Sequence, residues 1–129
     1  EGAINTILDW AKKKNLKVLW GKGKGSGSFY PMWEYNGTLY NLVSFWSNST
    51  VEIQFQYMYK RVPDIDEEWI KEIKRKFEIV FEKGLPPDGE LKNRRPSVPM
   101  SALLKKNKLD EFLAILDEIL NYYTKKVGG

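Results

Sequence analysis

Apolar residues at helical spacing open the chain and predict an α-helix over residues 3–15. The stripe that would be buried has the i, i+3, i+4, i+7 spacing of one helix face, and it consists of Ile4, Ile7, Leu8 and Ala11. Trp10 falls off this stripe. We therefore expect Trp10 at the edge of the buried face.

From residue 17 to residue 60 the apolar positions change to an alternation of two, which predicts an antiparallel sheet. A short strand is expected at 17–20, and a three-stranded meander follows it. The meander is rich in aromatic side chains: Phe29, Tyr30, Trp33, Tyr35, Tyr40, Phe45, Trp46, Phe55, Tyr57 and Tyr59. These rings form either a core or a stacking surface for a ligand, and the strand register decides between the two.

Two turns set the expected register. Asn36-Gly37 is typical of a two-residue type I′ hairpin, and the polar segment 47–50 is read as a four-residue turn. The resulting cross-strand pairs are Trp33 with Tyr40, Phe29 with Ser44 and Trp46 with Val51.

This register places most of the rings on one face, which we interpret as the core: Trp33, Tyr40, Trp46, Phe55 and Tyr57. The reverse face is mixed. Tyr30 and Phe45 fall on it beside Gln54 and Gln56, so these four are candidates for stacking or polar contacts with a ligand. The alternative is that a helix covers this face.

Two further helices are predicted over residues 64–83 and 108–124, separated by a basic Pro-rich loop at 84–100 and one helical turn at 101–105. Asp64 or Asp66 would cap the first of these helices, and Gly84 would end it. We therefore expect a single α+β domain over residues 1–129. Its antiparallel meander of three to four strands would span residues 17–60, with the N-terminal helix and the two C-terminal helices packed mainly on one face.

The chain contains neither Cys nor His, and this removes whole classes of chemistry. Thiol and Ser-His nucleophiles, structural zinc, haem ligation and a His general base are excluded. Glu34 and Glu52 share a sheet face but lie several residues apart along it, so they do not converge as a catalytic pair. We expect no metal, no cofactor and, on balance, no enzymatic activity.

Charge adds two candidate contact loops to this picture. The net charge is +4, with the positive excess concentrated in residues 1–28 and 84–106. In the first segment, Lys22 and Lys24 stand in a Gly-rich stretch that could hold a phosphate through amides and ammonium groups. A mobile hairpin connection is the alternative.

In the second segment, Arg94 and Arg95 precede a proline and could present planar forks to a phosphate. The alternative is that one of them ties the loop to the acidic helix at 66–82. If both basic loops open toward one surface, cations and aromatic faces would together suit single-stranded nucleic acid.

The leading functional hypothesis is therefore a non-catalytic binding module for nucleic acid. The alternatives are a protein–protein interaction domain of a larger prokaryotic protein and, third, an enzyme that uses carboxylate or Lys chemistry. No apolar run approaches the ~18–20 residues of a membrane span, so no membrane partner is expected. The absence of Cys fits a reducing compartment, and we expect a cytoplasmic location.

Two resemblances point the same way. The order of elements over residues 3–83, with Leu19-Trp20-Gly21-Lys22-Gly23 and Tyr40-Asn41-Leu42-Val43-Ser44-Phe45, resembles the MmcQ/YjbR-like group. That group consists of small α+β domains, some of them suspected of binding DNA. Over most of its length the chain is also similar to uncharacterised accessory domains of bacterial and archaeal proteins, which carry segments like Val51–Gln56 followed by Arg94–Pro99. Neither resemblance implies catalytic residues.

Overall fold

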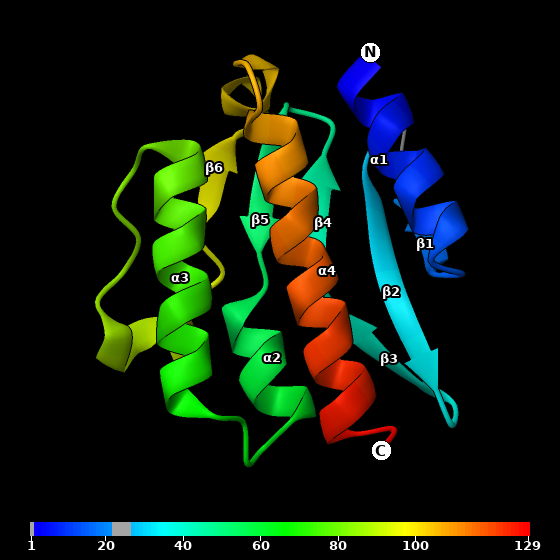
Figure 1. The fold of residues 1–129 in the computed structure, drawn as a ribbon, viewed down its shortest axis with the longest axis vertical. Helices are drawn as coiled ribbons and strands as arrows, with labels where there is room; N and C mark the ends of the chain where they lie inside the picture. Colours follow the sequence, from blue (N-terminus) through cyan, green and yellow to red (C-terminus); the bar gives the residue numbers. More distant parts are fainter. Residues whose placement is uncertain (1, 22–26) are drawn as a thin grey trace.

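The computed structural model describes residues 2–21 and 27–129, and it has the expected α+β architecture (Figure 1). The helices are α1 (Gly2–Lys13), α2 (Phe55–Arg61), α3 (Glu67–Phe81) and α4 (Lys108–Lys126), with the 3₁₀ segments η1 (Asp88–Asn93) and η2 (Met100–Leu104). The strands are β1 (Lys17–Trp20), β2 (Phe29–Tyr35), β3 (Thr38–Asn41), β4 (Val43–Trp46), β5 (Thr50–Ile53) and β6 (Ser97–Pro99).

All strands pair antiparallel in one sheet of order β1-β2-β4-β5-β6, with β3 paired to β2. The fold class is therefore confirmed, but the sheet has more strands than the three or four expected. The extra edge strand, β6, lies within the Pro-rich loop. Proline is tolerated on an edge because it need not donate to the ladder. Helices α1, α3 and α4 lie over one face of the sheet (Figure 1).

The Asn36-Gly37 hairpin forms as predicted, and both residues have positive φ, 51° and 80°. Trp33 lies opposite Tyr40, also as predicted. The register then slips by one residue, because β3 ends at Asn41 and β4 begins at Val43 with Leu42 between them. Phe29 consequently lies opposite Phe45 instead of Ser44. Since side chains alternate between faces, this inserted residue exchanges the two faces of β4 relative to the prediction.

The next turn is also one residue shorter than predicted. Trp46 pairs with Thr50 instead of Val51, and Ser49 closes the turn at φ 66°. The predicted long strand is wrong as well, because it ends at Ile53 and α2 follows at once. Three residues of this segment are buried at the i, i+3, i+7 spacing of a helix: Phe55, Met58 and Val62. The alternation of apolar and polar residues over 51–59 suits a strand equally well.

The remaining helices match the prediction closely. Asp66 caps α3, and its carboxylate accepts hydrogen bonds from the backbone amides of Glu68 and Trp69. The left-handed residue that ends α3 is Glu82, at φ 53°, and not Gly84. Trp10 lies deeper than expected because its indole Nε1 donates to the carboxylate of Asp117 on α4 at 2.8 Å.

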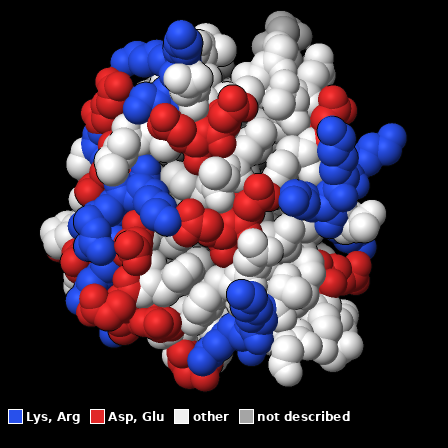
Figure 2. All heavy atoms as spheres, in the orientation of Figure 1, with Lys and Arg blue, Asp and Glu red and all other residues white. Residues whose placement is uncertain are grey.

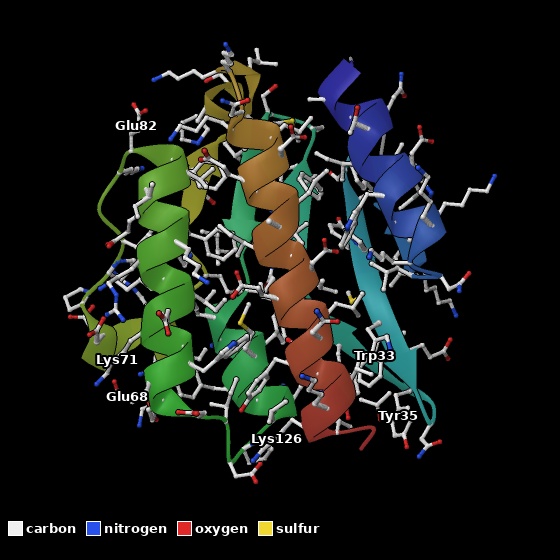
Figure 3. The ribbon with its side chains drawn as sticks, in the orientation of Figure 1. Trp33, Tyr35, Glu68, Lys71, Glu82 and Lys126 are labelled. Carbon is white, nitrogen blue, oxygen red and sulfur yellow. The ribbon has the colours of Figure 1, made fainter. Side chains whose placement is uncertain are left out.

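Aromatic side chains join the helix layer to the sheet. The Tyr123 ring of α4 stacks on Trp33 at 6.2 Å and contacts Tyr40 at 5.3 Å, measured between ring centroids. Trp33 also stacks on Tyr35 beside the C-terminal end of α4 (Figure 3). The expectation that helices cover the face with Trp33 and Tyr40 is confirmed.

Candidate functional site

The segment around Arg94 and Arg95 runs directly beside the end of β5 and the start of α2. The Ile53 amide donates to the Pro96 carbonyl at 2.9 Å, and the Gln56 amide donates to the Arg94 carbonyl at 3.0 Å. These bonds continue the β5–β6 pairing, in which Glu52 lies opposite Ser97. The two arginines are thereby brought to the glutamines that were predicted separately as polar contacts.

A polar hollow of about 450 Å³ lies at this junction. Its walls are formed by Glu52, Gln56, Pro86, Asn93, Arg94, Arg95 and Pro96. The proline rings restrict the backbone of the rim, and the remaining lining groups are two guanidinium groups, two amides and one carboxylate. This composition suits a polar ligand that carries both acceptors and donors.

Behind one wall of the hollow, Gln54 forms a buried hydrogen-bond network with Ser44 and Glu52. The Gln54 amide Nε2 donates to Ser44 Oγ at 2.8 Å and to Glu52 Oε1 at 2.9 Å. Gln54 is only 2% exposed, and its Oε1 has no hydrogen-bond partner among the described residues. Burying an acceptor without a donor costs about 1–3 kcal/mol. Gln54 therefore orients Glu52, and the prediction that it contacts a ligand directly stays untested.

Beside the hollow, α2 adds further positive charge around one aromatic ring. The Arg95 guanidinium lies 5.4 Å from the centroid of Tyr57, and Lys60 Nζ lies 5.9 Å from the same centroid. Arg61 is also exposed, and its Nε donates to the Leu39 carbonyl at 3.0 Å. We call Lys60, Arg94 and Arg95 the cationic rim; Arg61, whose hydrogen bond is to β3, is not part of it. Lys60 and Arg61 were not predicted as contact residues, and Tyr57 was assigned to the core face, because the segment 51–59 was read as a strand.

The arginines do not tie the loop to α3 in the described part of the chain. Arg94 has its ion pair within its own segment, to Glu90 Oε1 at 3.8 Å, and Arg95 contacts Tyr57. The connection to α3 has the opposite polarity, from Lys74 Nζ to Asp88 Oδ1 at 2.9 Å. This hydrogen bond holds the pKa of the Asp88 carboxyl below its usual value. Both guanidinium groups therefore remain exposed and available to a ligand.

Phe45 is not a stacking residue, which corrects the prediction. Its side chain is completely buried, stacked on Phe29 with 4.7 Å between ring centroids and packed edge-on against Phe112 of α4. The inserted Leu42 is the physical reason, because it turns Phe45 to the helix side. The same slip turns Trp46 to the reverse face, where it is 37% exposed and contacts the half-buried Tyr30 edge-on at 5.4 Å.

The other predicted phosphate ligands, Lys22 and Lys24, lie outside the described residues. The described ends of their segment meet where the Gly21 amide donates to the Ser28 carbonyl at 2.8 Å. Whether these lysines share a surface with Arg94 and Arg95 stays a prediction.

The helix-bearing face carries charges of both signs. Figure 2 shows Lys and Arg interleaved with Asp and Glu over this face. Many of them are paired, as Lys76 is with Glu118 at 2.7 Å and Lys105 with Glu82 at 2.9 Å. Such exposed pairs contribute little to stability, but they neutralise each other at the surface. The cationic rim is therefore the stronger candidate for an anionic ligand.

Comparison of the chain with models of protein families, with curated proteins and with solved structures gave no match. In the described part of the chain, no helix is long and apolar enough to cross a bilayer. Over residues 2–21 and 27–129, no cluster of three or more potential ligands could hold a metal ion.

Proposed function

We propose that this chain is a non-catalytic module that binds single-stranded nucleic acid at the polar hollow and its cationic rim. The observation that carries the proposal is the position of Arg94 and Arg95. Both are exposed, and they flank a hollow whose other walls supply amides and a carboxylate. Phosphates would bind the guanidinium groups on the rim, and bases would enter between the polar walls.

Tyr57 supplies the aromatic component of this interface. It is half-buried on α2, and the Arg95 guanidinium and Lys60 Nζ lie 5.4 and 5.9 Å from its ring centroid. A ring that is flanked by cations gives a base a stacking partner while the phosphates stay close to positive charge, which is the combination that single-strand binders use. Tyr30 and Trp46 form a second aromatic pair on the same side of the sheet as Glu52.

A single strand fits this surface better than a duplex. Major-groove readers present a helix whose exposed side chains reach the base edges. The helix nearest the rim, α2, has only seven residues and is packed against η1 and β3. A hollow with donors and acceptors on several walls instead suits an unstacked base.

The proposal is tested by fluorescence anisotropy with a labelled nine-nucleotide thymidine tract at about 20–200 mM salt. We expect affinity to fall as salt rises. Arg94→Ala and Arg95→Ala should each weaken binding. Each should also reduce the slope of log affinity against log salt concentration by about one. Lys106→Ala is the matched control, because Lys106 is exposed and does not line the hollow. Absence of binding at the lowest salt would refute the proposal.

The second candidate is a protein-interaction domain of a larger prokaryotic protein. It is favoured by exposed apolar side chains away from the hollow, with Ile79 at 66% and Leu104 at 73% exposure. Ile79 borders an apolar hollow of about 220 Å³ between α3 and α4. Ile79→Ser should leave oligonucleotide binding unchanged, so the two surfaces can be tested separately. The resemblances to MmcQ/YjbR-like and accessory domains, and the cytoplasmic location, remain part of the proposal.

A further inference from the structure

We propose that the hollow selects guanine, which Glu52 recognises through the base's adjacent N–H donors. This inference rests on the proposed function and goes beyond it, because phosphate contacts on the rim carry no sequence preference. It depends on three features of Glu52: its place in the wall, the group that orients it, and the ion pair that it does not make.

Glu52 is a carboxylate in a hollow whose other charged lining residues are Arg94 and Arg95. It lies on β5, is half-buried, and lines the same hollow as Arg94 and Arg95. Nevertheless, within residues 2–21 and 27–129 Glu52 forms no ion pair with either arginine. A phosphate would be repelled by this carboxylate and attracted to the rim, so the group that enters the hollow beside Glu52 should be the base.

The carboxylate is also held in a fixed orientation before any ligand arrives. Gln54 Nε2 donates to Glu52 Oε1 at 2.9 Å and is itself held by Ser44 Oγ at 2.8 Å. Both Gln54 and Ser44 are buried, at 2% and 5% exposure. Because Glu52 can only accept hydrogen bonds, this contact also fixes which end of the Gln54 amide faces it. A pre-oriented acceptor discriminates between ligands better than a mobile one does.

The donor pattern of the bases then decides which one fits. Guanine presents the N1–H and N2–H donors side by side on its Watson–Crick edge, and these match the two oxygens of one carboxylate. Adenine and cytosine present one amino group beside an acceptor, and thymine presents one N–H between two carbonyls that would face Glu52 unfavourably. The amides of Gln56 and Asn93 in the same walls can donate to guanine O6.

The test uses thymidine nine-mers whose central base is guanine, hypoxanthine, adenine or thymine. All four carry the same phosphate charge, so the salt-dependent contribution cancels in their affinity ratios. We expect the wild type to bind the guanine oligonucleotide about tenfold more tightly than the all-thymine one, as a bidentate contact requires. Hypoxanthine lacks the 2-amino group and should fall between them.

Glu52→Gln is the diagnostic variant, because it keeps the size of the side chain and removes the charge. It should bring the guanine-to-thymine ratio close to one without weakening binding of the all-thymine oligonucleotide. If this variant does not fold by circular dichroism, a central N1-methylguanine tested on the wild type takes its place. It blocks one donor and should abolish the preference.

The two proposals fail in different ways. Salt-dependent binding that needs Arg94 and Arg95 but shows no guanine preference would overturn the role of Glu52 and leave the proposed function standing. A preference for adenine, or a guanine preference that persists in Glu52→Gln, would also overturn it. Absence of binding by all four oligonucleotides would refute both proposals.

Discussion

The guanidinium of Arg95 lies 5.4 Å from the ring centroid of Tyr57 on α2. Lys60 Nζ lies 5.9 Å from the same centroid, so two cations of the rim contact one aromatic ring. The Tyr57 contact keeps Arg95 close to the hollow, and among the described residues Arg95 has no acidic partner that a ligand would have to displace. An exposed cation–π contact contributes only about 0.5–1 kcal/mol to stability. The main effect of the Arg95–Tyr57 contact is therefore to position the positive charge of Arg95.

The first prediction concerns the Tyr57 ring. Tyr57→Leu should weaken binding of a thymidine nine-mer by about 1–3 kcal/mol, because one stacked base loses its partner. Its free energy of unfolding in urea should fall by no more than about 1 kcal/mol, the value of the lost cation–π contacts.

Tyr57→Phe is the matched control for this prediction. It retains the aromatic face and should bind nearly as the wild type does in the same anisotropy assay. Equal affinity of the Leu and Phe variants would show that Tyr57 does not stack on a base.

The second prediction compares two neighbours that the slipped register places on opposite faces. Phe45 is completely buried between Phe29 and Phe112, so Phe45→Ala should lower the free energy of unfolding by about 3–5 kcal/mol. Trp46→Ala should cost clearly less, because Trp46 is 37% exposed. Urea unfolding of both variants measures the difference. A larger loss for Trp46→Ala would support the register expected from the sequence and contradict the structural one.

Helices α1, α3 and α4 and the first hairpin were predictable because their signals are local. Asp66 caps α3 from its own first turn, and Asn36-Gly37 specifies a turn that few other residues can adopt. The register beyond Asn41 was not predictable. The segment 38–46 is apolar on both sides, so shifting it by one residue exposes no obvious error in the pattern. One inserted residue, Leu42, was enough to exchange Phe45 with Trp46.

The prediction of a strand over residues 51–59 was wrong for a different reason. The segment alternates as a strand should, yet its buried residues Phe55 and Met58 also have helical spacing. Only the surrounding packing decides between these conformations. At the site, Arg94, Arg95, Gln54 and Gln56 were each singled out from the sequence. They lie close together because β6 pairs with β5. β6 is a three-residue strand with no recognisable sequence signal.

The third prediction concerns Tyr123 and alkaline pH. Its side chain is completely buried, and its hydroxyl donates to the Asn41 carbonyl at 2.6 Å. Burial raises the pKa of this phenol well above its usual value of about 10. The unfolded chain therefore ionises Tyr123 above pH ~10 while the folded chain does not. Its contribution to stability is complete below pH ~10 and declines as the pH rises beyond it.

Tyr123→Phe separates the two consequences. At pH 7 it should lower the free energy of unfolding by about 1–2 kcal/mol through the lost hydrogen bond. Between pH ~10 and ~11.5 its stability should fall less steeply than that of the wild type, because one ionising group of the unfolded state is gone. Parallel pH profiles of the urea midpoint for the two proteins would contradict this account.

The fourth prediction concerns the anchor that holds the arginine segment against α3. Lys74 Nζ lies 2.9 Å from Asp88 Oδ1, and the hydrogen bond from Lys74 lowers the pKa of Asp88. Because the folded-state pKa is depressed, this stabilisation is present above the usual aspartate value of about 4 and is lost as pH falls through the lower folded value. Asp88→Asn should therefore reproduce at neutral pH what acid does to the wild type: faster amide exchange in η1 and weaker oligonucleotide binding through Arg94 and Arg95.

Asp110→Asn is the control, since Asp110 is exposed and forms no ion pair in the described part of the chain. If both variants exchange and bind like the wild type, the ion pair does not position the arginines, and the pairing of β6 with β5 suffices to hold them at the hollow.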